Sequence, residues 1–185
     1  GQEILKQFQL MDAMTREVLA FARGDSQVLV RKVYLHRFLA DVREHLNKEF
    51  EGKSITLQME TPYQGLAWFD EIKIRRVISN LSTNAARAMP EGGTFTVSCQ
   101  KVDETLQLSF GDTGTGIPPE MEGRLFDLFA TSGRAGGTGL GLAIVKKIVT
   151  EHNGTVTYET EAGAGTTFTI ALPFPPPTDE EDPWD

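Results

Sequence analysis

Glycine is concentrated in one stretch of this chain, and that stretch constrains the fold more than any other feature. Of the 18 glycines, twelve lie between Gly111 and Gly165. Glycine adopts backbone conformations that side chains forbid, and it lets another backbone or a ligand approach closely. Two of the clusters adjoin predicted elements: DTGTGIP follows an apolar strand, and GGTGLGL opens a helix. These two loops are therefore the first candidates for a binding site.

The composition describes a soluble globular protein with one domain and an appendage. The chain has 185 residues, of which 39% are hydrophobic and 24% charged. Its net charge of -8 argues against a nucleic-acid partner. A single cysteine, Cys99, excludes an internal disulfide framework and a cysteine-based zinc site. No signal peptide and no apolar run of about 18 residues are present. We expect a cytoplasmic domain, and the sequence leaves open whether a membrane sensor precedes Gly1.

Helical and strand patterns mix without a regular alternation. Gln2 to Ala22 reads as one helix with a heptad seam, and its alternative interpretation is a helix packed on its own domain. The mixture favours an α/β sandwich with a mixed sheet over a doubly wound fold. Strands are predicted at 28–30, 54–60, 66–69, 94–100, 106–110, 155–159 and 166–172, and helices at 35–50, from a cap at Asp70 to Met89, and at 140–151.

Three polar side chains share one face of the helix that carries ISNLSTNAARAM. Asn80, Asn84 and Arg87 are spaced four and three residues apart. Asparagine is a mediocre helix former and is seldom buried without partners. Its amide oxygen suits a hard cation such as magnesium. The alternative interpretation is an ordinary polar face on a surface helix.

The two glycine loops offer complementary chemistry. Asp112 ends an apolar strand beside glycines, which places a carboxylate where a flat ligand can approach the backbone. The run that begins at Gly136 opens a helix, whose free N–H groups and dipole attract an anion. No lysine-serine or lysine-threonine pair follows the run, and no strand precedes it. It is therefore neither a Walker loop nor a dinucleotide fingerprint.

Together the segments resemble the N, G1, F and G2 boxes of the ATP-binding domain of sensor histidine kinases. The matching segments are NLSTNAARAM, DTGTGIP, RLFDLFAT and GGTGLGLAIVKKIV, within residues 28–172. This domain belongs to a superfamily shared with DNA gyrase, the Hsp-type chaperones and the mismatch-repair ATPases. The resemblance implies a Bergerat-type two-layer α/β sandwich, in which helices cover a mixed, mostly antiparallel sheet.

The resemblance implies that asparagines and arginines serve the phosphates of ATP. Asn84 would hold the magnesium ion that bridges the phosphates, with Asn80 assisting. Arg87 and Arg124 would lie near the phosphates, where charge must be neutralised during phosphoryl transfer. Many relatives have a lysine after the F-box threonines, and Arg134 would do a similar task here from a slightly different place.

The adenine base would bind at the G1 loop. Asp112 would accept a hydrogen bond from the adenine amino group, and Gly114 and Gly116 would let the base enter. Thr166 would support the base from the opposite strand. The remaining nucleotide-binding residues implied by the resemblance are Ile117, Phe129, Thr131, Gly137, Thr138, Gly139, Leu140, Gly141 and Leu142.

A glycine-rich loop would close over the phosphates. The segment 131–137 combines three glycines with small polar residues, so we expect a mobile lid. Phe126 and Phe129 would anchor this lid by packing.

The residue at position 80 separates kinases from ATPases in this superfamily. The ATPase branches usually carry a glutamate there, which activates a water molecule. Asn80 has no basic oxygen, which favours transfer to a protein nucleophile over hydrolysis. The alternatives are an ATPase, a serine-directed kinase of the anti-sigma or mitochondrial type, and a degenerate domain that serves as a binding scaffold.

None of the three histidines resembles a phosphate acceptor. His36, His45 and His152 lie in YLHRF, REHLN and TEHNG, and none precedes the acid and proline that usually follow the acceptor. His152 is interpreted as a cation at a helix C-terminus. We therefore expect the acceptor to lie upstream of this chain.

The ends of the chain complete the predicted organisation. The opening helix resembles the second helix of a dimerisation hairpin whose first helix carries the acceptor, and we assign it residues 1–24. Residues 25–174 would form the catalytic domain, and the acidic, proline-rich tail 175–185 would be disordered. The implied partners are the protein's own hairpin in a homodimer and the receiver domain of a response regulator.

Overall fold

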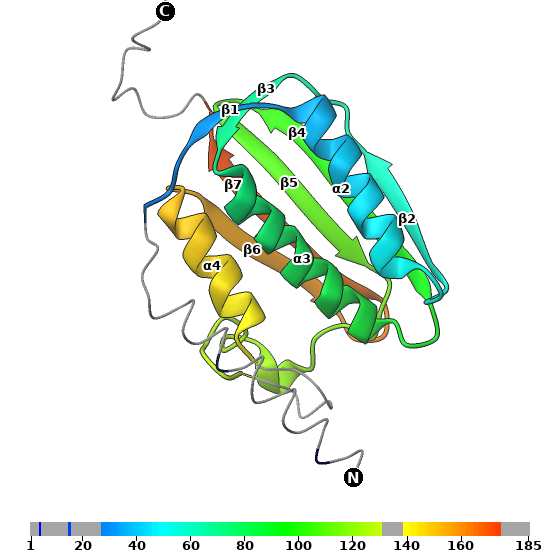
Figure 1. Ribbon diagram of the computed structural model, residues 1–185. Helices are drawn as coiled ribbons and strands as arrows, with labels where there is room; N and C mark the ends of the chain where they lie inside the picture. The colour runs from blue at the N-terminus through cyan, green and yellow to red at the C-terminus, as the bar shows by residue number, and fades with distance from the viewer. Residues whose placement is uncertain (1–3, 5–14, 16–26, 131–138, 175–185) are drawn as a thin grey trace, which may run out of the picture.

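The protein folds as two layers, a mixed β-sheet and three helices that cover one of its faces (Figure 1). The computed structural model describes residues 27–130 and 139–174, and the single positions Ile4 and Thr15. The predicted opening helix, apart from those two positions, the loop 131–137 and the tail 175–185 lie outside the described residues. In the described ranges, no helix has the length and apolar character needed to cross a membrane.

The main sheet has five strands in the order β2-β4-β5-β7-β6. β2 runs parallel to β4, and the other neighbours are antiparallel. This confirms the predicted mixed, mostly antiparallel sheet. The five strands are β2 (Ile55–Glu60), β4 (Gly93–Val102), β5 (Thr105–Asp112), β6 (Thr155–Glu161) and β7 (Gly165–Pro173).

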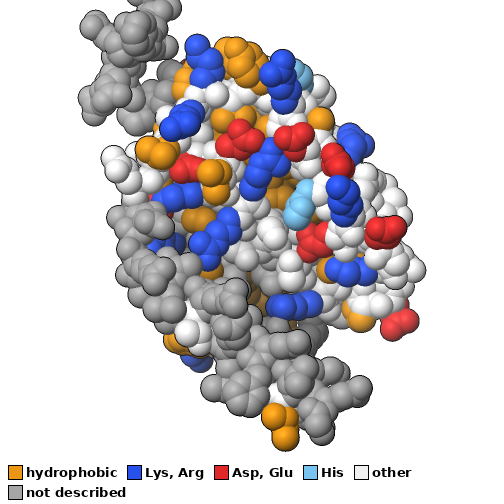
Figure 2. Space-filling view, in the orientation of Figure 1, with side chains coloured by type: hydrophobic (Ala, Val, Ile, Leu, Met, Phe, Trp, Pro, Cys, Tyr) orange, Lys and Arg blue, Asp and Glu red, His pale blue; other side chains and the backbone are white. Residues whose placement is uncertain are grey.

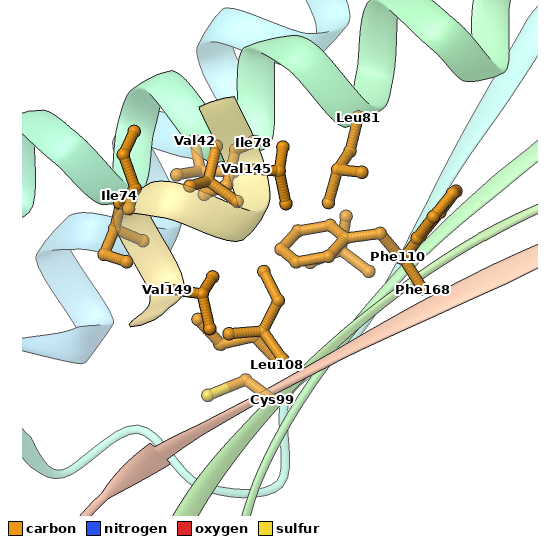
Figure 3. Packing of buried hydrophobic residues seen from close by; sticks show 14 of the residues in the cluster. Val42, Ile74, Ile78, Leu81, Cys99, Leu108, Phe110, Val145, Val149 and Phe168 are labelled. Atoms are coloured by element: carbon orange, nitrogen blue, oxygen red, sulfur yellow. The ribbon is translucent and has the colours of Figure 1, made fainter. Parts of the chain in front are cut away.

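The helices are α2 (Leu35–Phe50), α3 (Glu71–Ala88) and α4 (Gly141–Glu151), with α3 between the other two (Figure 1). Their apolar faces meet the inner face of the sheet, where Leu81 of α3 and Val145 of α4 approach Phe110 of β5 (Figure 3). The outward side of the helices carries cations and anions intermixed (Figure 2). Arg75 on this side pairs with Asp41 at 2.9 Å, an exposed link between α3 and α2.

A short strand pair precedes the main sheet. β1 (Arg31–Tyr34) pairs antiparallel with β3 (Leu66–Phe69). The predicted strand at 28–30 was therefore misplaced by three residues, because pairing with β3 fixes the strand and buries Val33. The apolar Leu29 and Val30 stay exposed outside this pairing.

Asp70 caps α3, as predicted, and also ties the chain before β1 to the domain. Its Oδ1 accepts hydrogen bonds from the backbone N–H groups of Ile72 and Lys73, both at 3.1 Å. Its Oδ2 accepts a third from the N–H of Leu29 at 3.1 Å. A cap of this kind contributes about 1 kcal/mol.

His152 is not the helix-terminal cation that the sequence suggested. The side chain is buried, its Nε2 accepts the backbone N–H of Asp70 at 3.0 Å, and its Nδ1 donates to the carbonyl of Ile148 at 2.7 Å. This pattern requires the neutral ring, with its proton on Nδ1. Burial lowers the pKa of His152 below 6.5 and outweighs the opposing effects of the Ile148 carbonyl and of Asp70.

We expect His152 to make the domain less stable in mild acid. In the unfolded chain the ring binds a proton near pH 6.5, and in the folded domain only at lower pH. The unfolded state therefore binds more protons in that window, and the free energy of unfolding falls as the pH drops below about 6.5. Denaturant unfolding at pH 7.5 and 5.5 should show a smaller loss for His152→Gln than for the wild type. An equal fall in the free energy of unfolding for both proteins would contradict this role of His152.

Candidate functional site

The predicted site residues that the structure describes lie at one end of the sandwich. The C-terminal end of α3, the N-terminal end of α4 and the segment 113–130 lie together there (Figure 1). That segment includes a single 3-10 turn, η1 (Pro119–Met121). The strand β5 also ends here at Asp112, opposite the start of β7.

Asn80 faces the beginning of α4. A Cβ atom placed on Gly141, the first residue of α4, would lie 3.7 Å from Oδ1 of Asn80, an ordinary contact. Nδ2 of Asn80 is buried and has no hydrogen-bond partner among the described residues. Leu140, the N-cap residue of α4, is apolar, and its side chain makes no capping hydrogen bond. A buried amide N–H without a partner among the described residues thus lies near a helix N-terminus, an arrangement that suits an anion.

The other phosphate candidates are spread along α3 and the F-box segment. Asn84 follows Asn80 by one turn and is half-buried, and Arg87 is exposed in the last turn of α3. Arg124 lies at the surface with 75% of its side chain exposed, 3.7 Å from the carboxylate of Asp127. The structure thus brings Asn80 and Gly141 together but leaves both arginines in solvent.

Asp112 presents a carboxylate at the end of β5. Its Oδ1 accepts the backbone N–H of Gly114 at 2.9 Å. Burial raises the pKa of Asp112, and hydrogen bonds from the backbones of Gly114 and Thr166 oppose this rise only in part. The free domain therefore holds a carboxylate in a setting that disfavours its charge.

Thr166 lies directly across from Asp112 in the β5–β7 register. Its buried hydroxyl lies 3.1 Å from the hydroxyl of Thr160, its partner in the β6–β7 register. Thr160 also accepts the backbone N–H of Ile117 at 2.9 Å and so ties the G1 loop to the sheet. The sequence analysis missed Thr160, whose link to the G1 loop depends on a register that local patterns did not give.

Gly114 and Gly116 are required by the protein itself. A Cβ atom on Gly114 would come within 2.6 Å of the Ala88 carbonyl oxygen at the end of α3. Gly116 has a φ of +70°, and a Cβ atom there would lie 2.4 Å from the carbonyl oxygen of Glu161. The expected role of admitting the base is therefore not needed to explain these glycines.

The F-box phenylalanines behave differently from each other. Phe126 packs against Tyr158 and Phe168, as expected of an anchor. Phe129 is 58% exposed with a φ of +63°, so its ring lies outside the core, and the loop that it is expected to anchor lies outside the described residues. Its backbone N–H instead donates to the carbonyl of Gly139 at 2.9 Å.

Three predicted nucleotide contacts have side chains that belong to the core. Leu140 is buried, and Ile117 and Leu142 pack against the core cluster from its edge. Side-chain packing therefore accounts for these three residues without a nucleotide. Four further predicted residues, Thr131, Arg134, Gly137 and Thr138, lie outside the described residues.

In the described part of the chain, no group of three or more His, Cys, Asp or Glu side chains could hold a metal. Glu151, the last residue of α4, pairs with Lys73 at 3.2 Å and with Lys147 at 3.9 Å, at the end of α4 that is away from Asn80. The site offers amides, one carboxylate and a helix N-terminus.

Comparison with known proteins agrees with this arrangement. The family described as "Histidine kinase-, DNA gyrase B-, and HSP90-like ATPase" matches residues 69–176. The adaptive-response sensory kinase SasA of Gloeothece citriformis (strain PCC 7424) is 32% identical over 182 residues, which cover 93% of this chain and 46% of SasA. The chain spans less than half the length of the curated relatives that it matches.

Two solved structures share the fold at 27% identity. Full-length ShkA, in complex with AMPPNP, has a TM-score of 0.77 over 88% of this chain and 35% of its own. The nucleotide-free catalytic domain of the histidine kinase ThkA has a TM-score of 0.69 over 78% of this chain and 97% of its own. The chain therefore belongs to the family of histidine kinase-, DNA gyrase B- and HSP90-like ATPases, and it forms the ATP-binding catalytic domain of a sensor histidine kinase.

Proposed function

We propose that this domain transfers the γ-phosphoryl group of magnesium-ATP to a histidine on a dimerisation hairpin. An imidazole nitrogen of the acceptor would attack the γ-phosphorus, the bond to the bridging oxygen would break, and ADP would leave. The acceptor nitrogen would then lose its proton to solvent. The phosphoryl group would pass on to an aspartate in the receiver domain of a response regulator.

The observation that carries the proposal is the pairing of Asn80 with the start of α4. The Nδ2 of Asn80 is a donor without a partner among the described residues, and the N-terminus of α4 adds backbone N–H groups and a favourable dipole. Gly141 has room for a Cβ atom, so the protein alone does not demand glycine there. Glycine would instead leave space for a phosphate group beside Asn80.

The amides also fit a magnesium ion that binds together with the nucleotide. Magnesium prefers oxygen ligands and commonly takes a few protein groups plus substrate phosphates. The amide oxygens of Asn84 and Asn80 would supply the protein's share. Bound there, the ion would neutralise charge on the phosphates.

Asp112 and Thr166 would recognise the base at the opposite side of the site. Asp112 has a second oxygen beyond the one that accepts from Gly114, and this oxygen could accept from the adenine amino group. The Thr160–Thr166 hydroxyl pair would hold the neighbouring wall in place.

An amide at position 80 supports transfer over hydrolysis. Asn80 cannot take a proton from water, so the site lacks the base that an ATPase needs at this position. Use of ATP and relay to a receiver domain would place the reaction in the cytoplasm. The partners would be the protein's own hairpin, as a homodimer, and the response regulator.

Asp112→Asn should weaken ATP binding about tenfold or more, because hydrogen bonds to charged groups contribute about 1.5–3 kcal/mol. The free variant should be at least as stable as the wild type at pH 7, because burial disfavours the charge of Asp112. Calorimetry with ATP and denaturant unfolding measure the two effects. Asp127→Asn, which removes an exposed acid in the F-box segment, is the control. Unchanged ATP affinity in Asp112→Asn would exclude the adenine role.

Asn84→Ala should abolish the tightening of ATP binding by magnesium while sparing binding in EDTA. The substitution removes an oxygen ligand but leaves the adenine contacts in place. Titrations with and without magnesium give this ratio of affinities for both proteins. A variant that responds to magnesium as the wild type does would rule out Asn84 as the ligand.

Phosphoryl transfer is tested with γ-labelled ATP. The domain alone should gain no acid-labile label, and a dimerisation hairpin added in trans should gain it slowly, because tethering is lost. Arg124→Ala should reduce transfer more than ATP affinity, because phosphate charge develops most at the transition state. Stoichiometric acid-labile label on the domain alone would make one of its own histidines the acceptor. Phosphate release without any labelled hairpin would favour an ATPase.

A further inference from the structure

We propose that Glu49 is a positioning residue, whose carboxylate holds α3 from its α2 side and thereby sets where Asn80 and Asn84 lie. The inference rests on the proposed function, because it assigns Glu49 to the magnesium-phosphate end of that site. Glu49 would not touch ATP or the metal. It would act through the rotation of α3 about its own axis.

The carboxylate of Glu49 makes two hydrogen bonds to consecutive residues of α3. Oε2 accepts from the hydroxyl of Ser82 at 2.6 Å, and Oε1 accepts from the hydroxyl of Thr83 at 2.9 Å. The Glu49 side chain is only 15% exposed, and Ser82 is fully buried. His45, one turn earlier on α2 and largely exposed, lies 3.8 Å from Oε2. These contacts span 33 and 34 residues of sequence and join two helices at one carboxylate.

The two sides of α3 are coupled by simple helix geometry. Successive residues turn about 100° around a helix, so Ser82 points roughly 200° away from Asn80. Ser82 thus meets α2, and Asn80 meets Gly141 of α4 on the other flank, with α3 between the two helices (Figure 1). Any rotation that loosened the Glu49 contacts would also move Asn80 relative to the start of α4.

Directional bonds are needed because apolar packing does not define a rotation sharply. The core contacts of α3 are hydrophobic, and that attraction has no preferred direction. A two-point contact to a fixed carboxylate does define the rotation. The other polar link between these helices, Arg75 to Asp41, is exposed, and such pairs contribute little.

Stability alone does not explain a buried polar cluster here. Replacing buried charged groups by apolar residues of similar size is often neutral or stabilising. The best-supported role of polar groups in a core is to select one packing arrangement of the helices and strands. The cluster lies one residue from Asn84, the proposed metal ligand, where such specification would affect function.

The test compares nucleotide binding by Glu49→Leu and the wild type, with magnesium and with EDTA. Leucine keeps the volume but removes both acceptors, while Ser82 retains its 3.1 Å bond to the Ser79 carbonyl. Loss of a supporting outer-shell group commonly lowers metal affinity roughly 10-fold or more. We therefore expect Glu49→Leu to lose about 10-fold of the magnesium-dependent tightening. ATP affinity in EDTA should fall by less than this factor, because the proposed adenine contacts at Asp112 stay in place.

Two further variants separate positioning from general damage. Glu49→Gln should retain most of the magnesium effect, because its amide oxygen can accept from Thr83 and its N–H can donate to Ser82. Asp41→Ala removes the exposed link between the same helices and should leave the magnesium effect unchanged. If Glu49→Leu does not fold, Thr83→Val removes one hydroxyl of the pair without changing the shape and should lower the magnesium effect by itself.

The outcomes distinguish this inference from the proposed function. Wild-type protein that shows no tightening by magnesium refutes the proposed metal site itself. A wild type that tightens, together with a folded Glu49→Leu that tightens equally, refutes the positioning role and leaves the metal site intact. Equal losses of the magnesium effect in Glu49→Leu and Asp41→Ala would also overturn it, because any loosening of α2 would then suffice.

Discussion

The burial of α3 between two helices and a sheet is the constraint on which the rest of the structure depends. Its apolar residues face the sheet and include Ile74, Val77, Ile78, Leu81 and Ala85, all nearly inaccessible. Once this face is fixed, its two flanks must meet α2 and α4. The same helix therefore presents Asn80 to the α4 side and Ser82 to the α2 side. Its two ends are constrained as well, by Asp70 at the start and by Gly114 against Ala88 at the finish.

Within the described ranges, the candidate site is where polar groups remain in unfavourable settings. Asn80 has a buried amide nitrogen without a partner among the described residues, which costs about 1–3 kcal/mol. The carboxylate of Asp112 is held where burial raises its pKa. By contrast, His152 is more deeply buried than Asn80 or Asp112, yet both of its ring nitrogens are paired. Asn80 and Asp112 thus lower the stability of the domain by itself, which is a reason to expect a ligand beside them.

Local signals in the sequence predicted most helices and strands. The wrong predictions concern residues whose structure depends on a partner far away in the sequence. The bounds of α2 and β3 and the cap at Asp70 follow from nearby residues, and the structure confirms them. The strand before α2 was misplaced because pairing with β3 selects it. His152 was given the wrong charge because its partner Asp70 lies 82 residues away. The sequence gives no signal for Glu49, because a single acidic residue on a helix indicates no role until the fold places two hydroxyl groups beside it.

The residue at position 80 affects both the stability of the domain and the reaction that the site favours. A glutamate there would place a charge beside the N-terminus of α4, where the dipole would stabilise it and bound phosphate would repel it. It would also supply the base that activates water. An asparagine offers a donor to phosphate and an oxygen to a metal, and it carries no charge and no basic oxygen. The price is an unpaired amide in the free domain. Its amide nitrogen would gain a partner from a phosphate oxygen, so the group that costs stability in the protein alone is one that would recognise the phosphates.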